Sequence, residues 1–308
     1  GGTDASVQPD YITVFPTWQF ISTDVTPPAR GEYGLAYDSE HDVVILYGGS
    51  ANGWPYENST WEFDGVDWTP ATTTHRPNAV YGMSMVYDSS RQNVMLFGGS
   101  NSSDDALAET WTYSGTEWTQ LTLVTSPPAR TNTAIVYSNN SQTVYLFGGH
   151  STTTYYNDLW QFDGSAWSQV LVNGESPPAR TLHGLAYDSH NHTLLLFGGR
   201  SAAGAQLADT WIFEFATHTW REVVASGPGG RQAHALIYDP AQDAVVLVGG
   251  VTDDGDTWLN DTWHFQNEVW LAGDPAPTTS GIAYHKLIYD SAENACLLFA
   301  NGETWQYR

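Results

Sequence analysis

The chain has 308 residues, enough to bury one sizeable core, and 14% of them are aromatic while only 14% are charged. Thirty-four acidic residues stand against ten basic ones, and the resulting formal net charge of −24 disfavours nucleic acids and anionic membranes as partners. No apolar run is long enough to span a bilayer, so we expect no membrane insertion.

A unit of about fifty residues recurs six times, and its copies carry the same elements in the same order. In the first copy an apolar segment ends at Tyr37, and an Asp-Ser turn leads to the apolar run 43–47 and a Gly-Gly pair. A loop then precedes Trp61, which has an aromatic residue two positions later, and a glycine turn leads to a second tryptophan, Trp68. We expect four strands per copy, with the second strand buried on both faces because its apolar run is nearly continuous.

The sixth copy lacks a fourth strand, because the sequence ends at Arg308. Trp18 precedes Pro27 by nine residues, as Trp118 precedes Pro127, so the segment around Trp18 is predicted to complete the sixth copy. Pairing of the first and last segments closes a ring and removes exposed strand edges. We therefore predict one all-β domain over residues 1–308, a six-bladed β-propeller of four-stranded antiparallel blades. The predicted blades span about residues 27–70, 77–120, 127–170, 177–222, 229–272, and 278–308 together with 14–24.

These features resemble the kelch-repeat family of β-propellers, which includes bacterial kelch repeats and the central domain of galactose oxidase. The resemblance rests on the Gly-Gly pairs, on aromatic pairs such as Trp211 and Phe213, and on an Arg-x-x-His motif such as Arg180 to His183. It implies the propeller fold but no single function, since kelch propellers include protein-binding modules, enzymes and extracellular domains. A copper site like that of galactose oxidase is not expected, because the only cysteine, Cys296, lies in an apolar core run.

Alternating strand directions assign the connections of each blade to two faces. The loops after the Gly-Gly pairs and the linkers between blades share one face, here called the loop face, and the two short turns share the opposite face, the turn face. Acidic residues concentrate on the turn face, and several arginines fall on the loop face. We predict ligand binding at the axis mouth of the loop face, because sites often lie on loops above a rigid scaffold. The predicted ligand-binding residues are Arg30, Tyr33, Arg76, Tyr81, Arg130, Arg180, His183, Arg231, His234, Tyr284 and His285.

Two interpretations of the repeated arginine position remain open. Arginines at equivalent places in four blades could bind a carboxylate or an anionic peptide bidentately, as kelch protein-binding modules do by analogy. Alternatively, each arginine holds its own Pro-Pro-Ala-Arg linker by bonding backbone carbonyls. Val80 and Ile282 take this position in the second and sixth copies and break the symmetry.

Histidines and acidic loops give two candidate metal sites. His183, His234 and His285 share one repeat position, where inward-pointing imidazoles could hold a transition metal and imidazoles between blades would be structural. The acidic loop that contains Asp253, Asp254 and Asp256 could bind Ca²⁺ or be a solvated surface loop. For both candidates the structural interpretation is favoured, so no cofactor is required.

Three functions are compatible with this sequence. The first is a non-catalytic module that binds a protein, peptide or other ligand on the loop face, expected in an extracellular or cell-surface location. The second is an enzyme that acts on a sugar or a small anionic substrate through axial arginines and histidines, with or without a metal. The third is a lectin-like glycan binder that uses loop aromatics such as Trp54, Tyr56 and Tyr81.

Overall fold

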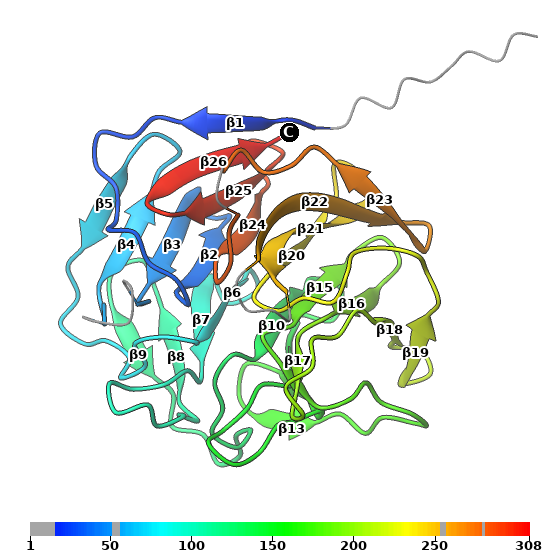
Figure 1. The fold of residues 1–308 in the computed structure, drawn as a ribbon. Coiled ribbons are helices and arrows are strands. Elements are labelled where there is room, and N and C mark those ends of the chain that lie inside the picture. The colour runs from blue at the N-terminus through cyan, green and yellow to red at the C-terminus, as the bar shows by residue number, and fades with distance from the viewer. Residues whose placement is uncertain (1–15, 51–55, 253–256, 279–280) are drawn as a thin grey trace, which may run out of the picture.

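The computed structural model describes residues 16–50, 56–252, 257–278 and 281–308 (Figure 1). These residues form six four-stranded antiparallel sheets that surround a central axis, with the C-terminal strand beside β1. The predicted six-bladed all-β propeller is therefore confirmed. Within the described ranges, no helix is long and apolar enough to cross a membrane.

The strands follow the expected order in every blade. Blade one comprises β2 (Gly34–Asp38), β3 (Val43–Tyr47), β4 (Thr60–Phe63) and β5 (Trp68–Ala71). Blade two comprises β6 (Ser84–Asp88), β7 (Asn93–Phe97), β8 (Thr110–Tyr113) and β9 (Trp118–Gln120). Blade three comprises β10 (Ala134–Ser138), β11 (Thr143–Phe147), β12 (Leu159–Phe162) and β13 (Trp167–Gln169).

The second half of the ring repeats this pattern. Blade four comprises β15 (Gly184–Asp188), β16 (Thr193–Phe197), β18 (Thr210–Glu214) and β19 (Thr219–Val223), and a short pair joins β14 (Arg180–Thr181) to β17 (Arg200–Ser201). Blade five comprises β20 (Ala235–Asp239), β21 (Ala244–Val251), β22 (Trp258–Gln266) and β23 (Val269–Gly273). Blade six comprises β24 (Lys286–Asp290), β25 (Ala295–Ala300), β26 (Glu303–Tyr307) and β1 (Trp18–Ile21).

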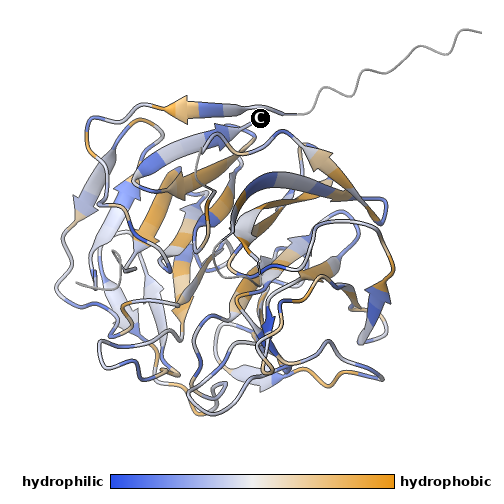
Figure 2. Ribbon diagram, in the orientation of Figure 1, coloured by the Kyte–Doolittle hydropathy of each residue, from blue (hydrophilic) through white to orange (hydrophobic). Residues whose placement is uncertain are grey.

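The second strand of each blade forms the hydrophobic core between neighbouring blades. In β3, Ile45, Leu46 and Tyr47 have no solvent exposure, because blades pack against both faces of this strand. The outer strands carry more polar residues, as the hydropathy colouring in Figure 2 shows. Continuous apolar runs and alternating runs thus identify inner and outer strands.

Buried aspartates shape the turn after the first strand. Asp38 Oδ1 accepts hydrogen bonds from the amides of Glu40 and His41 at 3.0 and 3.3 Å. Asp88, Asp188, Asp239 and Asp290 bind the equivalent turn amides in other blades. These side chains replace backbone partners that a tight turn leaves unpaired, and they account for much of the negative charge of the turn face.

A tryptophan–threonine hydrogen bond links successive blades. The indole Nε1 of Trp118 donates to Thr60 Oγ1 of the preceding blade at 2.9 Å, and equivalent bonds link Trp167 to Thr110 and Trp270 to Thr210. Blade three carries Leu159 at the threonine position, so the buried Trp220 Nε1 has no partner among the described residues.

The first strand closes the ring as the fourth strand of blade six. β1 pairs antiparallel with β26, with Trp18 opposite Tyr307 and Ile21 opposite Thr304. Trp18 Nε1 donates to Thr262 Oγ1 of blade five at 3.4 Å, which repeats the link that the other second tryptophans make. The prediction that the segment around Trp18 completes the last blade is confirmed.

Candidate functional site

The repeated arginines hold the linkers between blades in place. Arg180 is fully buried, and its Nε and Nη1 donate to the carbonyls of Pro178 and Gly198 at 3.0 and 2.9 Å. Its guanidinium also forms a bidentate ion pair with Asp209, at 2.7 and 2.6 Å. Arg130 with Asp158 and Arg231 with Asp261 repeat this arrangement. Each group thus fixes a linker, a Gly-Gly pair and the start of a third strand, which is the structural alternative considered for this position.

Blade one departs from this arginine–aspartate arrangement, which we call the arginine clamp. Arg30 bonds the carbonyls of Pro28 and Gly48, but Ser59 stands where the other clamps have aspartate. Arg30 Nη2 is buried without a hydrogen-bond partner among the described residues, and burial lowers the pKa of this guanidinium. Ligand binding by these four arginines stays a prediction, and their burial gives it little support.

The three repeated histidines lie between blades. His183 packs edge-on against Phe147 with ring centroids 5.5 Å apart, and His234 packs in the same way against Phe197. A Cβ atom on Gly148 would come within 2.7 Å of His183, so the glycine pair of one blade makes room for the histidine of the next. This is the structural interpretation that the sequence favoured.

Burial keeps these imidazoles neutral. Desolvation lowers the pKa of both His183 and His285 to about 3, and it also lowers the pKa of His234 well below its ordinary value. Their ring nitrogens make no well-formed hydrogen bond to any described residue, although the Phe147 carbonyl favours the protonated form of His183. A buried neutral imidazole contributes packing rather than charge.

Neither candidate metal site gains support. No three His, Cys, Asp or Glu side chains in the described parts of the chain are grouped so that they could hold a metal ion. Asp253, Asp254 and Asp256 lie outside the described residues, as does Trp54. Binding of Ca²⁺ or a transition metal therefore stays a prediction.

A belt of backbone hydrogen bonds narrows the axis at the loop face. Six equivalent residues, one per blade, adopt left-handed backbone conformations with φ between 51° and 65°. The amide of each donates to the carbonyl of its counterpart in the preceding blade at 2.8 to 3.2 Å, and the six bonds form a closed cycle. The belt residues are Glu32, Gly82, Asn132, Leu182, Ala233 and Tyr284. The cavity beside the belt measures only about 30 Å³.

A cavity lies along the axis and opens on the turn face. This axial cavity measures about 410 Å³ and is lined by the first strands of all six blades. Exposed turn residues such as Ser39 and Ser89 lie at its mouth, and Lys286, His183 and His234 lie at its inner end, below the belt. This axial cavity is thus reached from the face opposite to the one on which ligand binding was predicted.

Lys286 is the residue that sequence reasoning missed. It lines both the axial cavity and the small cavity at the belt, and it is the only lysine in the chain. Burial lowers the pKa of its ammonium group, and Glu32 opposes this shift. The other five blades have only small residues at this repeat position. An alignment of the six repeats would therefore have singled out Lys286 as a candidate functional residue.

Aromatic residues gather on the loop face where blades one and two meet. The rings of Tyr56 and Tyr81 stack with centroids 5.1 Å apart, and both hydroxyls donate to Asp104, at 3.0 and 2.8 Å. The exposed Arg76 donates to Asn58 at 3.2 Å. We call Tyr56, Arg76, Tyr81 and Asp104 the blade one–two patch.

Other predicted loop-face residues lie apart from this patch. Tyr33 is fully buried, and its hydroxyl donates to the Phe299 carbonyl of blade six. Tyr284 belongs to the belt and packs edge-on against Trp258, which is 45% exposed, with centroids 6.3 Å apart. The structure thus divides the predicted binding residues into buried packing groups and separate surface groups.

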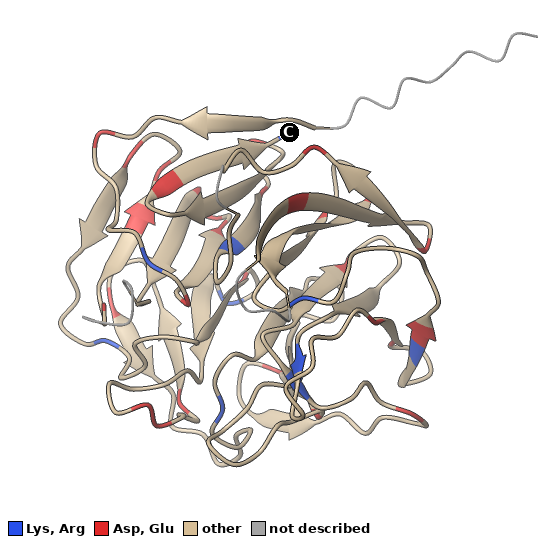
Figure 3. Ribbon diagram, in the orientation of Figure 1, with Lys and Arg blue, Asp and Glu red and all other residues tan. Residues whose placement is uncertain are grey.

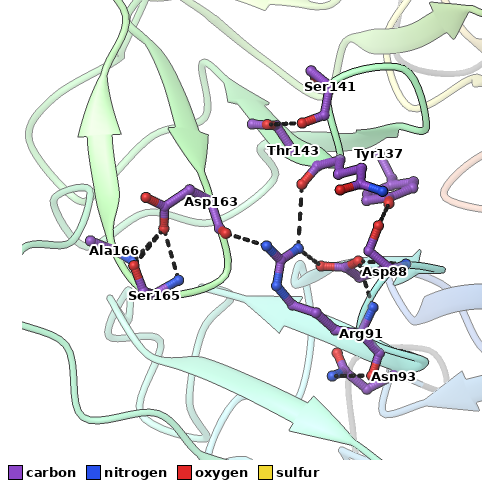
Figure 4. A network of polar contacts seen from close by, with 11 residues as sticks. Asp88, Arg91, Asn93, Tyr137, Ser141, Thr143, Asp163, Ser165 and Ala166 are labelled. Atoms are coloured by element: carbon purple, nitrogen blue, oxygen red, sulfur yellow. Dashed lines mark hydrogen bonds and ion pairs between the residues drawn. The ribbon is translucent and has the colours of Figure 1, made fainter.

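The turn face is acidic and its basic residues are engaged. Figure 3 shows that acidic residues outnumber basic ones over the ribbon. Arg91 of blade two donates to Asp88 Oδ2 at 2.5 Å and reaches the carbonyls of Gln142 and Asp163 in blade three (Figure 4). This arginine joins two blades.

Comparison with known proteins agrees with this architecture. Residues 42–165 and 164–291 match the kelch-repeats domain described as KLHDC2/KLHL20/DRC7. The chain belongs to the kelch-repeat family. The kelch propeller is similar to the solved structure of YjhT, with a TM-score of 0.70 and 16% sequence identity over 92% of this chain and 95% of the YjhT chain. At this identity the likeness shows the fold alone, and no curated protein matched the sequence.

Proposed function

We propose that this kelch propeller is a binding module that holds a protein or peptide partner on its loop face. The blade one–two patch is the observation that carries the proposal, because it combines two stacked tyrosine rings with an exposed arginine. Tyrosine and arginine are the residues that contribute most at protein interfaces. The belt narrows the axis at this face, so a partner would lie across the surface rather than enter the ring.

Rigid support favours such a surface. The linkers that carry Tyr81 and its counterparts are held by the belt, and the arginine clamps fix the neighbouring linkers. A preorganised surface loses less conformational entropy when a partner binds. The enzyme alternative receives less support, because the repeated arginines and histidines that it required are buried between blades.

A peptide-display selection against the whole protein tests this function. Selected peptides should bind the wild type and lose roughly tenfold or more in affinity to Tyr81→Ala or Arg76→Ala, which corresponds to about 1.4 kcal/mol or more. Tyr155→Ala is a matched control, because Tyr155 is a loop-face tyrosine of blade three outside the patch. The proposal fails if selected peptides bind all three variants equally, or if hydrogen exchange places them on the turn face.

Glycan binding is the second candidate, since stacked tyrosine rings beside a carboxylate also suit a sugar face and its hydroxyls. A glycan array with wild type and Tyr56→Ala distinguishes the two, because only the glycan hypothesis expects a sugar signal that this substitution removes. The extracellular or cell-surface location stays a prediction, which fractionation of the source organism tests.

A further inference from the structure

The axial cavity has the form of a small-molecule site that is separate from the loop face. Its volume of about 410 Å³ falls in the size range of ligand pockets in proteins. Apolar side chains such as Leu35, Met85 and Leu236 line its middle. Six tyrosines, one from each first strand, line its outer part: Tyr37, Tyr87, Tyr137, Tyr187, Tyr238 and Tyr289.

The tyrosine hydroxyls are largely used by the turns. Tyr37 donates to Asp42 at 2.8 Å and Tyr238 donates to Asp243 at 2.7 Å, while Tyr137 shares a hydrogen bond with Ser90. Hydroxyls held in this way leave aromatic ring surface to line the cavity. A flat aromatic molecule is the ligand shape that such a lining favours.

Lys286 places a primary amine at the inner end of this cavity. Its ammonium group forms no hydrogen bond or ion pair with any residue that the structure describes, and its backbone amide donates to the Tyr33 hydroxyl oxygen at 3.0 Å. The same repeat position holds only small residues in the other blades: Gly34, Ser84, Ala134, Gly184 and Ala235. One long side chain therefore stands in a ring of five small residues.

Burial shifts this amine toward its neutral form. It lowers the pKa of Lys286, although the charge of Glu32 opposes the shift, and the neighbouring imidazoles of His183 and His234 are uncharged. A desolvated lysine whose pKa is lowered has a higher fraction of nucleophilic amine at neutral pH, which is the condition for attack on a carbonyl. The acidic turn face at the mouth disfavours entry of anions, whereas it leaves a neutral carbonyl compound unaffected.

We propose that the axial cavity admits a small aromatic aldehyde or ketone from the turn face and that Lys286 captures its carbonyl carbon as an imine. The lone pair of Nζ forms the carbon–nitrogen bond while the carbonyl π electrons move to oxygen and give a carbinolamine. The oxygen then leaves as water with both amine hydrogens, and the carbon–nitrogen double bond forms. Water is the only by-product, and the step needs no oxidant or reductant.

Reductive trapping tests the proposal on the unmodified protein. The protein is incubated with benzaldehyde and cyanoborohydride, which converts any imine into a benzylated amine, and peptide mass mapping locates the label. Lys286 is the only lysine, so its competitor is the α-amino group, which serves as an internal reference. Labelling of Lys286 should saturate with benzaldehyde concentration and be inhibited by benzyl alcohol, whereas labelling of the α-amino group should rise linearly and ignore the alcohol.

A cavity-filling variant separates binding from simple reactivity. Ala134→Leu adds bulk to the wall of the axial cavity and leaves Lys286 in place, so labelling should fall by roughly tenfold, equivalent to about 1.4 kcal/mol. The melting temperature, measured beside each labelling experiment, shows that the variant is folded. An unlabelled Lys286, or labelling that is linear and indifferent to Ala134→Leu, overturns the proposal. Binding on the loop face does not depend on this result.

Discussion

Three buried histidines should make the propeller lose stability in mildly acidic solution. His183, His234 and His285 are at most 6% exposed and neutral in the folded protein, whereas in the unfolded chain they have an ordinary pKa near 6.5. Below that pH the unfolded chain binds more protons than the folded protein. The stability is therefore complete above about pH 6.5 and falls as the pH decreases toward the folded pKa of about 3.

The expected loss can be worked out from these pKa values. Each histidine contributes about 1.4 kcal/mol per pH unit below 6.5, so His183 and His285 together lower the free energy of unfolding by about 4 kcal/mol at pH 5. The clamp carboxylates Asp158 and Asp209 have lowered pKa values, so their stabilisation is lost only when the pH falls below about 4. The window from pH 6.5 to pH 4.5 thus excludes the clamp carboxylates. Glu32, whose pKa is raised by burial, and His150 and His264, whose pKa values are lowered by burial, also titrate there, so a substitution is needed to isolate one histidine.

Urea unfolding followed by tryptophan fluorescence at pH 7 and pH 5 measures this difference. The repeat itself supplies the test substitution, His183→Thr, because blade three carries Thr133 at the same position. This variant should show about 2 kcal/mol less loss between the two pH values than the wild type. His190→Asn is the control, since the His190 side chain is 64% exposed and blade three has Asn140 there. A wild-type pH dependence in His183→Thr would refute the reasoning.

Three further predictions concern the links between blades. Asp209→Ala should lower the free energy of unfolding by about 3 to 5 kcal/mol in urea titrations, because it leaves the buried Arg180 charge unpaired, and a loss no larger than that of the exposed Asp163→Ala would contradict the clamp. Ser59→Asp should raise it by about 1.5 to 3 kcal/mol by giving Arg30 the missing partner, an expectation that an unchanged urea midpoint would exclude. Thr110→Val removes the hydrogen-bond acceptor of Trp167, so it should lower the free energy of unfolding by about 1 to 3 kcal/mol and lower the melting temperature with it. Thr69→Val, at an exposed strand position, should leave the melting temperature unchanged.

The architecture was predictable from sequence because each blade repeats the same packing requirement. The tyrosine marks the first strand, the Gly-Gly pair marks the end of the second strand, and the tryptophans mark the outer strands. The spacing of Trp18 from Pro27 placed β1 in blade six. A position of the histidines between blades was the favoured interpretation, and the structure adds the reason, because each histidine occupies the space left by the glycine pair of the preceding blade.

The candidate sites were less predictable because they depend on contacts between loops and on backbone conformation. The aspartate partner of each arginine lies 28 to 30 residues further along, across a loop of variable length. The belt requires left-handed conformations at residues such as Glu32 and Leu182, whose types give no hint of it. The axial cavity that opens on the turn face was not anticipated from loop position alone, and Lys286 was visible only as an exception within the alignment of repeats. Ligand binding at the loop face stays a prediction.

The belt at the loop face affects how cooperatively the propeller unfolds. Every belt residue donates one bond and accepts another, so no blade can tilt away from the axis without breaking two bonds at once. Open repeat proteins can fray from a terminal unit, whereas a closed cycle offers no terminal unit at which fraying begins. The belt therefore fixes the six blades relative to one another, and we expect them to unfold together in a single cooperative transition.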